Sequence, residues 1–175
     1  MKKFLSFLLV LTTVLGLCAC GSSEQGGGDA ATGLQIGYAK EKIMPDTSVP
    51  LGGYGNSKER MSTGYFSTLE ARAVAVTGEK GQTLIFIVGD LSWCPNNFGS
   101  QIQSEIEETL GVPADHVILS GTHSHGTVDS SMIDMPVIQR FNVKYVEAML
   151  EAAQKAMDDR KPAQVFVGTA QTEGL

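Results

Sequence analysis

The sequence predicts an α/β domain, the front portion of a larger one, in which a largely parallel or mixed sheet is flanked by helices. The main evidence is the order of patterns over residues 83–168, which read strand, helix, strand, helix, strand. The first of these strands, Thr83–Val88, is a continuous apolar run, which is typical of a strand buried on both faces. Alternation of strands and helices implies right-handed crossovers and parallel pairing.

The first 19 residues have the features of a signal peptide. Two lysines precede an apolar stretch, residues 4–17, that is short for a bilayer span. The motif Leu-Cys-Ala-Cys, ending at Cys20, resembles a bacterial lipobox, which would attach a lipid to Cys20 after cleavage. The alternative is an ordinary secretory signal with incidental cysteines. The lipobox predicts a protein anchored by its acyl chains to the extracytoplasmic face of a bacterial membrane.

The remaining chain divides into a flexible Gly/Ser-rich tether, residues 20–33, and one domain, residues 34–175. The net charge of −6 becomes about −8 when the two amino-terminal lysines are removed. An acidic chain without a basic cluster argues against a nucleic-acid partner. With Cys20 lipidated, Cys94 has no partner for a disulfide. Cys94 is therefore expected to be a buried structural thiol, with a nucleophile as the alternative.

Two alternating stretches come before the strand–helix pattern. A short strand is expected at Leu34–Tyr38 and a longer one at Leu69–Val76. Between them, residues 44–64 form a long loop that contains several prolines and glycines. Its segment Leu51–Gly55 can bring backbone close to a ligand, and the alternative is an ordinary glycine-rich turn.

Two helices are expected to alternate with the remaining strands. The first is capped by Asn96 or Asn97 and runs to about Leu110, and the second covers roughly residues 137–160, each with apolar residues at helical spacing. The strand between the two helices begins at His116 and leads to the segment that contains His123 and His125. A last strand is expected at residues 163–168.

His123 and His125 are the strongest chemical signal, because two of the three histidines of the chain stand two positions apart. In an extended segment, residues two apart point to the same side, so both imidazoles can face one cavity. Neutral imidazole binds zinc, and a catalytic zinc site keeps one position open for a water that attacks a carbonyl. The alternatives are two polar loop histidines, or histidines oriented without a metal by Thr122 and Ser124.

Asp90 follows the strand Thr83–Val88 and is expected beside His123, because the carboxyl ends of neighbouring parallel strands meet at one edge. It can be a metal ligand, a base or the carboxylate that orients a ligating histidine, or it can cap its own turn. Asp129 is the other candidate for a third ligand. His116 lies outside this group, about 23 Å from His123 along the strand.

Several segments, in the same order along the chain, resemble the amino-terminal part of the neutral ceramidase family. The matching segments are Leu34–Lys40, Ile43–Pro45, Leu51–Gly55, Leu69–Val76, Phe86–Leu91 and Val117–His125. The resemblance implies a zinc-dependent amidase that cleaves the N-acyl bond of ceramide to give sphingosine and a fatty acid. Its partners would be this lipid substrate and, through Cys20, a membrane.

Carried onto this chain, the resemblance makes His123 a zinc ligand and His125 a neighbour of the bound water or substrate. We take His125 and Asp90 as the candidate catalytic residues. The resemblance also implies further zinc ligands beyond Leu175. The loop after His125 reads Gly-Thr-Val at residues 126–128, where the family continues Ser-Gly-Pro. Two alternatives are kept: a surface lipoprotein that binds a ligand without catalysis, and a metal-dependent hydrolase of another amide or ester.

Overall fold

The structure of the chain is a computed structural model that describes residues 33–92 and 96–174. The predicted signal peptide, Cys20 and Cys94 lie outside the described residues. The elements of the described part are β1 (Gln35–Lys42), η1 (Ser57–Glu59), β2 (Glu70–Thr77), β3 (Thr83–Gly89), α2 (Asn96–Leu110), η2 (Ala114–His116), β4 (Val117–Gly121), α3 (Pro136–Asp158) and β5 (Lys161–Pro162). Of the helices in this part, none is both long and apolar enough to cross a bilayer.

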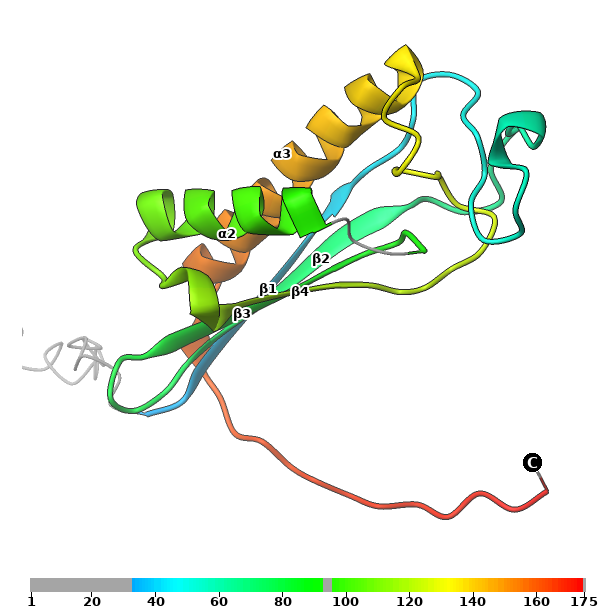
Figure 1. Cartoon of the computed structure of the whole chain (residues 1–175). Helices are drawn as coiled ribbons and strands as arrows, with labels where there is room; N and C mark the ends of the chain where they lie inside the picture. Colours follow the sequence, from blue (N-terminus) through cyan, green and yellow to red (C-terminus); the bar gives the residue numbers. More distant parts are fainter. Residues whose placement is uncertain (1–32, 93–95, 175) are drawn as a thin grey trace, which may run out of the picture. The chain divides into compact units, whose positions relative to one another are not determined.

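The strands form one mixed sheet in the order β4-β3-β2-β1-β5 (Figure 1). β2 pairs antiparallel with both β1 and β3, and β5 pairs antiparallel with β1. β3 and β4 are parallel. The α/β fold class is therefore confirmed in its mixed form, and the largely parallel form is wrong. In the described part, a helix makes a crossover between parallel strands only from β3 to β4, where α2 lies between them.

Both long helices cover the same face of the sheet (Figure 1). On that face the core contains three fully buried alanines of β2, Ala71, Ala73 and Ala75, and two isoleucines of β3. The small side chains let α3 lie close to the sheet. Gly37 of β1 shows how close, because a Cβ atom at this position would lie 2.0 Å from the carbonyl oxygen of Ala156 in α3.

The opposite face of the sheet is open and apolar. Tyr38, Val74, Phe86 and Ile118 stand next to one another across four strands, from β1 to β4. Tyr38 is 48%, Phe86 39% and Ile118 46% exposed. The prediction that Thr83–Val88 is buried on both faces is therefore wrong for the described part of the chain, where the helices cover one side only.

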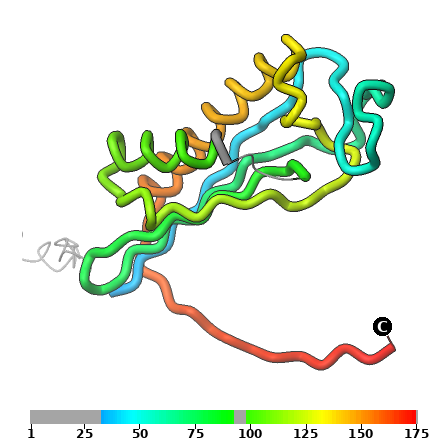
Figure 2. The backbone as a smooth tube through the Cα atoms, viewed as in Figure 1, coloured from blue at the N-terminus to red at the C-terminus, as the bar shows by residue number. Residues whose placement is uncertain are grey.

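The strand predicted at residues 163–168 does not form. β5 is two residues long, and its pairing with β1 ends where the backbone N–H of Ala163 donates to the Leu34 carbonyl at 2.9 Å. Figure 2 shows the following segment leaving the sheet. Its side chains Val165, Phe166 and Val167 are 65–89% exposed. The apolar pattern of a strand is present, but the described residues offer this segment no further strand to pair with.

Candidate active site

The two histidines follow β4 at the edge of the sheet where β3 also ends. Beyond the strands, the backbone N–H of Thr122 donates to the Gly89 carbonyl at 3.0 Å, and that of His123 donates to the Leu91 carbonyl at 3.1 Å. These bonds place His123 beside the turn that carries Asp90. The edge beyond the carboxyl ends of parallel strands is where α/β proteins usually form their sites.

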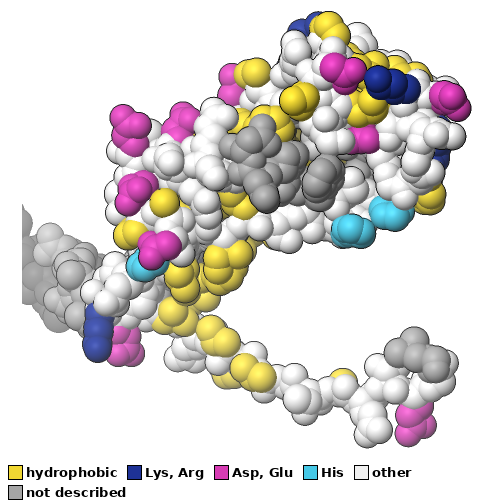
Figure 3. Space-filling model, in the orientation of Figure 1, with side chains coloured by type: hydrophobic (Ala, Val, Ile, Leu, Met, Phe, Trp, Pro, Cys, Tyr) yellow, Lys and Arg dark blue, Asp and Glu magenta, His cyan; other side chains and the backbone are white. Residues whose placement is uncertain are grey.

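The backbone at His123 is not extended. Its φ of +57° lies in the left-handed region, which few residues other than glycine adopt. The imidazoles of His123 and His125 therefore come together through a turn and not through strand alternation. Their ring centroids lie 5.3 Å apart, with the ring planes tilted by 46°. Figure 3 shows two histidine side chains near each other and the third far from them, and the ring of His116 contacts the Thr83 carbonyl at 3.0 Å instead.

The glycine loop Leu51–Gly55 approaches His125 closely. It is joined to the turn after His125 by two backbone hydrogen bonds of 2.9 and 3.0 Å. At Gly53, where φ is +96°, an added Cβ atom would lie 2.4 Å from Cγ of His125. The loop therefore approaches the imidazole of His125 closely, and its predicted approach to a ligand stays a prediction.

Tyr54 and Arg60 extend this contact and were not singled out from the sequence. The Tyr54 ring meets the His125 ring edge to face, with centroids 5.1 Å apart. The Arg60 guanidinium lies over the Tyr54 ring, 4.3 Å from its centroid. Tyr54 lies inside the loop Leu51–Gly55, for which the sequence predicts a close backbone approach without a role for the tyrosine. The Arg60 contact has no sequence signal, because it depends on the path of the loop.

Asp90 is held in an ion-pair cluster. Arg72 Nη1 donates to Asp90 Oδ1 at 2.8 Å, and the backbone N–H of Glu70 donates to Oδ2 at 3.0 Å. Burial raises the pKa of Asp90. Hydrogen bonds from Arg72, the Glu70 backbone and the Thr122 hydroxyl lower the pKa by more than burial raises it, so the net pKa lies below the ordinary carboxyl value. Because both carboxylate oxygens are occupied, these contacts favour the structural interpretation of Asp90 over a base or a ligand.

Asp129 is engaged in a similar way. Its carboxylate accepts hydrogen bonds from the Ser57 hydroxyl and from both the backbone and the hydroxyl of Ser131.

Within residues 33–92 and 96–174, no group of three histidine, cysteine or acidic side chains is placed to hold a metal. The centroids of the two imidazoles lie 5.3 Å apart, close to the distance of about 5 Å expected for two rings around one tetrahedral ion. His123 can therefore supply a nitrogen ligand while the His125 ring stays next to the same position.

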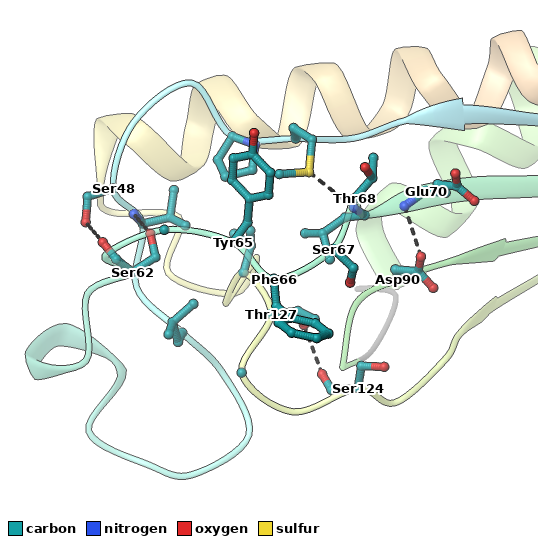
Figure 4. A pocket seen from close by; sticks show the side chains of 18 of the residues that line it. Ser48, Ser62, Tyr65, Phe66, Ser67, Thr68, Glu70, Asp90, Ser124 and Thr127 are labelled. Carbon is teal, nitrogen blue, oxygen red and sulfur yellow. Dashed lines mark hydrogen bonds between the residues drawn. The ribbon is translucent and has the colours of Figure 1, made fainter.

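A cavity of about 960 Å³ lies beside His125. It is lined by two stretches of the connection between β1 and β2, by Glu70 and Arg72 of β2, by Asp90 after β3, and by the turn that starts at Ser124. Figure 4 shows Tyr65 and Phe66 in the middle of this space, with Ser48 and Ser62 on one side and Glu70 and Asp90 on the other. The volume is within the range of small-molecule sites.

The Asp90→Asn variant tests the ion-pair cluster. We expect the free energy of unfolding at neutral pH to fall by about 1–2 kcal/mol, because Arg72 loses a charged hydrogen-bond partner. The folded-state pKa of Asp90 is lowered, so this stability is present above the ordinary carboxyl pKa and is lost as the pH falls through the folded-state value. Urea unfolding of both proteins should therefore give a smaller difference at about pH 3.

The matched control for this variant is Asp46→Asn. Asp46 forms a solvent-exposed ion pair with Lys144 on the surface, and its removal should change the free energy of unfolding by less than about 0.5 kcal/mol. Equal small effects from both substitutions at neutral pH would contradict a structural role for the Asp90 cluster.

Comparison with known proteins shows similarity to ceramidases, although no protein-family model matches the sequence. A neutral ceramidase of Drosophila pseudoobscura pseudoobscura is 27% identical over 121 residues, which cover 67% of this chain and 16% of that protein. Two solved structures, a ceramidase complexed with C2 and the neutral ceramidase from Pseudomonas aeruginosa, share the fold. Each has a TM-score of 0.66 and 19% identity, over 75% of this chain and 22% of that chain. The matched part of the chain thus corresponds to less than a quarter of the length of these relatives.

Proposed function

From its sequence and fold similarity to the neutral ceramidase family, which agrees with the resemblance of the motifs, we propose that this chain carries the histidine-bearing part of an amide hydrolase. Its reaction would be zinc-dependent cleavage of the N-acyl bond of a ceramide-type lipid to give sphingosine and a fatty acid. The observation that carries the proposal is the pair of imidazoles, whose ring centroids lie 5.3 Å apart, beside a cavity of about 960 Å³.

In this proposal His123 binds zinc through its imidazole, and His125 contacts the bound water or the substrate. When bound, zinc would polarise the amide carbonyl and make water acidic enough to attack it. Gly53 and Tyr54 hold the ring of His125 against the wall of the cavity. Asp90 acts indirectly, by joining the end of β3 to β2 through Arg72.

We also propose that Cys20 anchors the protein by lipid to the extracytoplasmic face of a bacterial membrane, which would bring the site to a lipid substrate. This part of the proposal is supported by the lipobox-like residues of the amino terminus alone. Mass spectrometry of the membrane-extracted protein would show a diacylglyceryl group on Cys20, and an unmodified cysteine would contradict the anchor.

A surface lipoprotein that binds a ligand without catalysis is the second candidate. It is favoured by the loop after His125, which reads Gly-Thr-Val at residues 126–128 where the family continues Ser-Gly-Pro. This candidate predicts ligand binding that does not depend on zinc, and no turnover. A hydrolase of another amide or ester is separated from the first candidate by comparing turnover on ceramide with turnover on a panel of fatty amides and esters.

The His123→Ala variant tests the hydrolase. We expect bound zinc to be lost and the hydrolysis of fluorescent ceramide to fall at least about 100-fold, because a metal ligand is removed. The measurements are metal content by mass spectrometry and product formation with the purified protein. His116→Gln is the control, since this histidine lies at the other end of β4 and bonds to a carbonyl there. Unchanged zinc content and turnover in His123→Ala would remove His123 from the site.

A further inference from the structure

Arg60 is placed beside the site by a loop that closes on itself. The loop leaves at Leu51 and returns at Arg60, where the backbone N–H of Leu51 donates to the Arg60 carbonyl at 2.9 Å. The backbone N–H of Arg60 donates in turn to the Ser57 carbonyl at 3.2 Å, and Pro50 forms a β-bridge with Met61. Both hydrogen-bonding groups of the Arg60 backbone are therefore engaged, which fixes the point from which its side chain starts.

The guanidinium of Arg60 contacts an aromatic ring and not a carboxylate. Its central carbon lies 4.3 Å from the centroid of the Tyr54 ring, within the range of a cation–π contact. Among residues 33–92 and 96–174, no acidic side chain forms an ion pair with Arg60. Lys58, two positions earlier in the same loop, instead pairs with Asp134 at 3.3 Å. Within the described part of the chain, the charge of Arg60 thus acts on the ring without competition from a paired carboxylate.

Tyr54 is held by contacts of its ring and not by the core. Its side chain is 62% exposed and lies outside the hydrophobic core. Its neighbours Gly53 and Gly55 both have a positive φ, +96° and +69°, so the backbone here is a glycine-rich turn that many conformations can replace. One contact of the ring is the Arg60 guanidinium, and the other is the imidazole of His125, with centroids 5.1 Å apart. The ring therefore connects the cation to the imidazole.

We propose that Arg60 is a positioning residue for His125 and acts through the ring of Tyr54. The guanidinium fixes the Tyr54 ring by a cation–π contact, and the fixed ring keeps the imidazole of His125 in its place in the site. Gly53 limits the same imidazole from the backbone side, where an added Cβ atom would lie 2.4 Å from its Cγ. This inference deepens the proposed function and rests on it for the catalytic role of His125, whereas the position of the ring can be measured without any turnover.

The test follows the ring signals of His125 by proton–carbon NMR of the full chain at about pH 8, where imidazoles of ordinary pKa are neutral. Tyr54→Leu sets the reference displacement of these signals, because it removes the neighbouring ring. We expect Arg60→Gln to displace them in the same direction by at least about half of that amount. Arg60→Lys should displace them by less, because it keeps a cation. Tyr54→Phe should leave them near the wild-type position, because both contacts are made by the ring.

The matched control is Lys58→Gln. This substitution removes a positive charge from the same loop, but the charge pairs with Asp134 and not with the Tyr54 ring. The His125 signals should therefore stay at the wild-type position. Wild-type signals in Arg60→Gln, equal displacements in Arg60→Gln and Lys58→Gln, or a displacement in Arg60→Lys as large as in Arg60→Gln would each overturn the inference.

Turnover on fluorescent ceramide, measured on the same proteins, separates this inference from the proposed function. With both correct, Arg60→Gln should lower kcat about two- to fivefold and leave KM nearly unchanged, because a misplaced imidazole affects the reacting geometry more than substrate binding. Displaced His125 signals in Arg60→Gln without any wild-type turnover would support the positioning role and reject the hydrolase. Wild-type turnover with unchanged His125 signals in Arg60→Gln would support the hydrolase and reject the positioning role.

Discussion

Gly37→Ala is expected to lower the free energy of unfolding by about 3 kcal/mol or more. An added Cβ atom would lie 2.0 Å from the Ala156 carbonyl oxygen and 2.8 Å from the Arg160 backbone nitrogen. Because these are backbone atoms, they cannot rotate away as a side chain would. The carboxyl-terminal end of α3 must then move off the sheet and uncover part of the core. Urea unfolding followed by circular dichroism measures the loss.

Gly78→Ala is the control for this variant. In the turn between β2 and β3, an added Cβ atom would lie 3.9 Å from its nearest neighbour, the Gln82 carbonyl oxygen, which is an ordinary contact. The free energy of unfolding should change by less than about 0.5 kcal/mol. If Gly37→Ala unfolds at the same urea concentration as Gly78→Ala, α3 does not pack against β1 as closely as the structure shows.

The helices of the fold could be predicted because their apolar spacing is a local property. α2 covers Asn96–Leu110, where a helix capped by Asn96 or Asn97 and ending near Leu110 was expected, and α3 covers Pro136–Asp158 where residues 137–160 were expected. Burial is not local in the same way. The apolar run Thr83–Val88 reads as a strand buried on both faces, yet Leu84 and Phe86 face the open side of the sheet. Which faces are covered depends on a layer that the pattern of one strand does not specify.

The candidate site was predictable as a cluster but not in its contacts. The two histidines were expected together, and they are together, although the turn at His123 replaces the extended backbone that was assumed. The partner of Asp90 had a usable signal, because β2 and β3 form a hairpin in which Arg72 pairs with Val88, two residues before Asp90 and on the same face. The contact between Gly53 and His125 had none, since it joins two loops.

Gly53→Ala is expected to displace the imidazole of His125. The added Cβ atom would lie 2.4 Å from Cγ and 2.7 Å from Cδ2 of the ring. The added atom would also lie 2.7 Å from Cβ of His125, which rotation of the side chain does not move, so the turn at His125 must shift together with the ring. The main effect therefore falls on the site and not on the core. The edge-to-face contact with Tyr54 is lost, and any turnover should fall at least about 100-fold because the ring is misplaced. The histidine ring signals in NMR spectra report the displacement without requiring turnover.

Gly55→Ala separates this contact from backbone strain. Gly55 also has a positive φ, +69°, but an added Cβ atom there would meet nothing within 4 Å. Both variants should therefore lose about 1–2 kcal/mol from the left-handed conformation, and only Gly53→Ala should shift the His125 signals. Equal shifts in both variants would mean that the loop acts through its conformation alone. A shift confined to Gly53→Ala would mean that the absence of a side chain at residue 53 is what leaves room for the imidazole at the wall of the cavity.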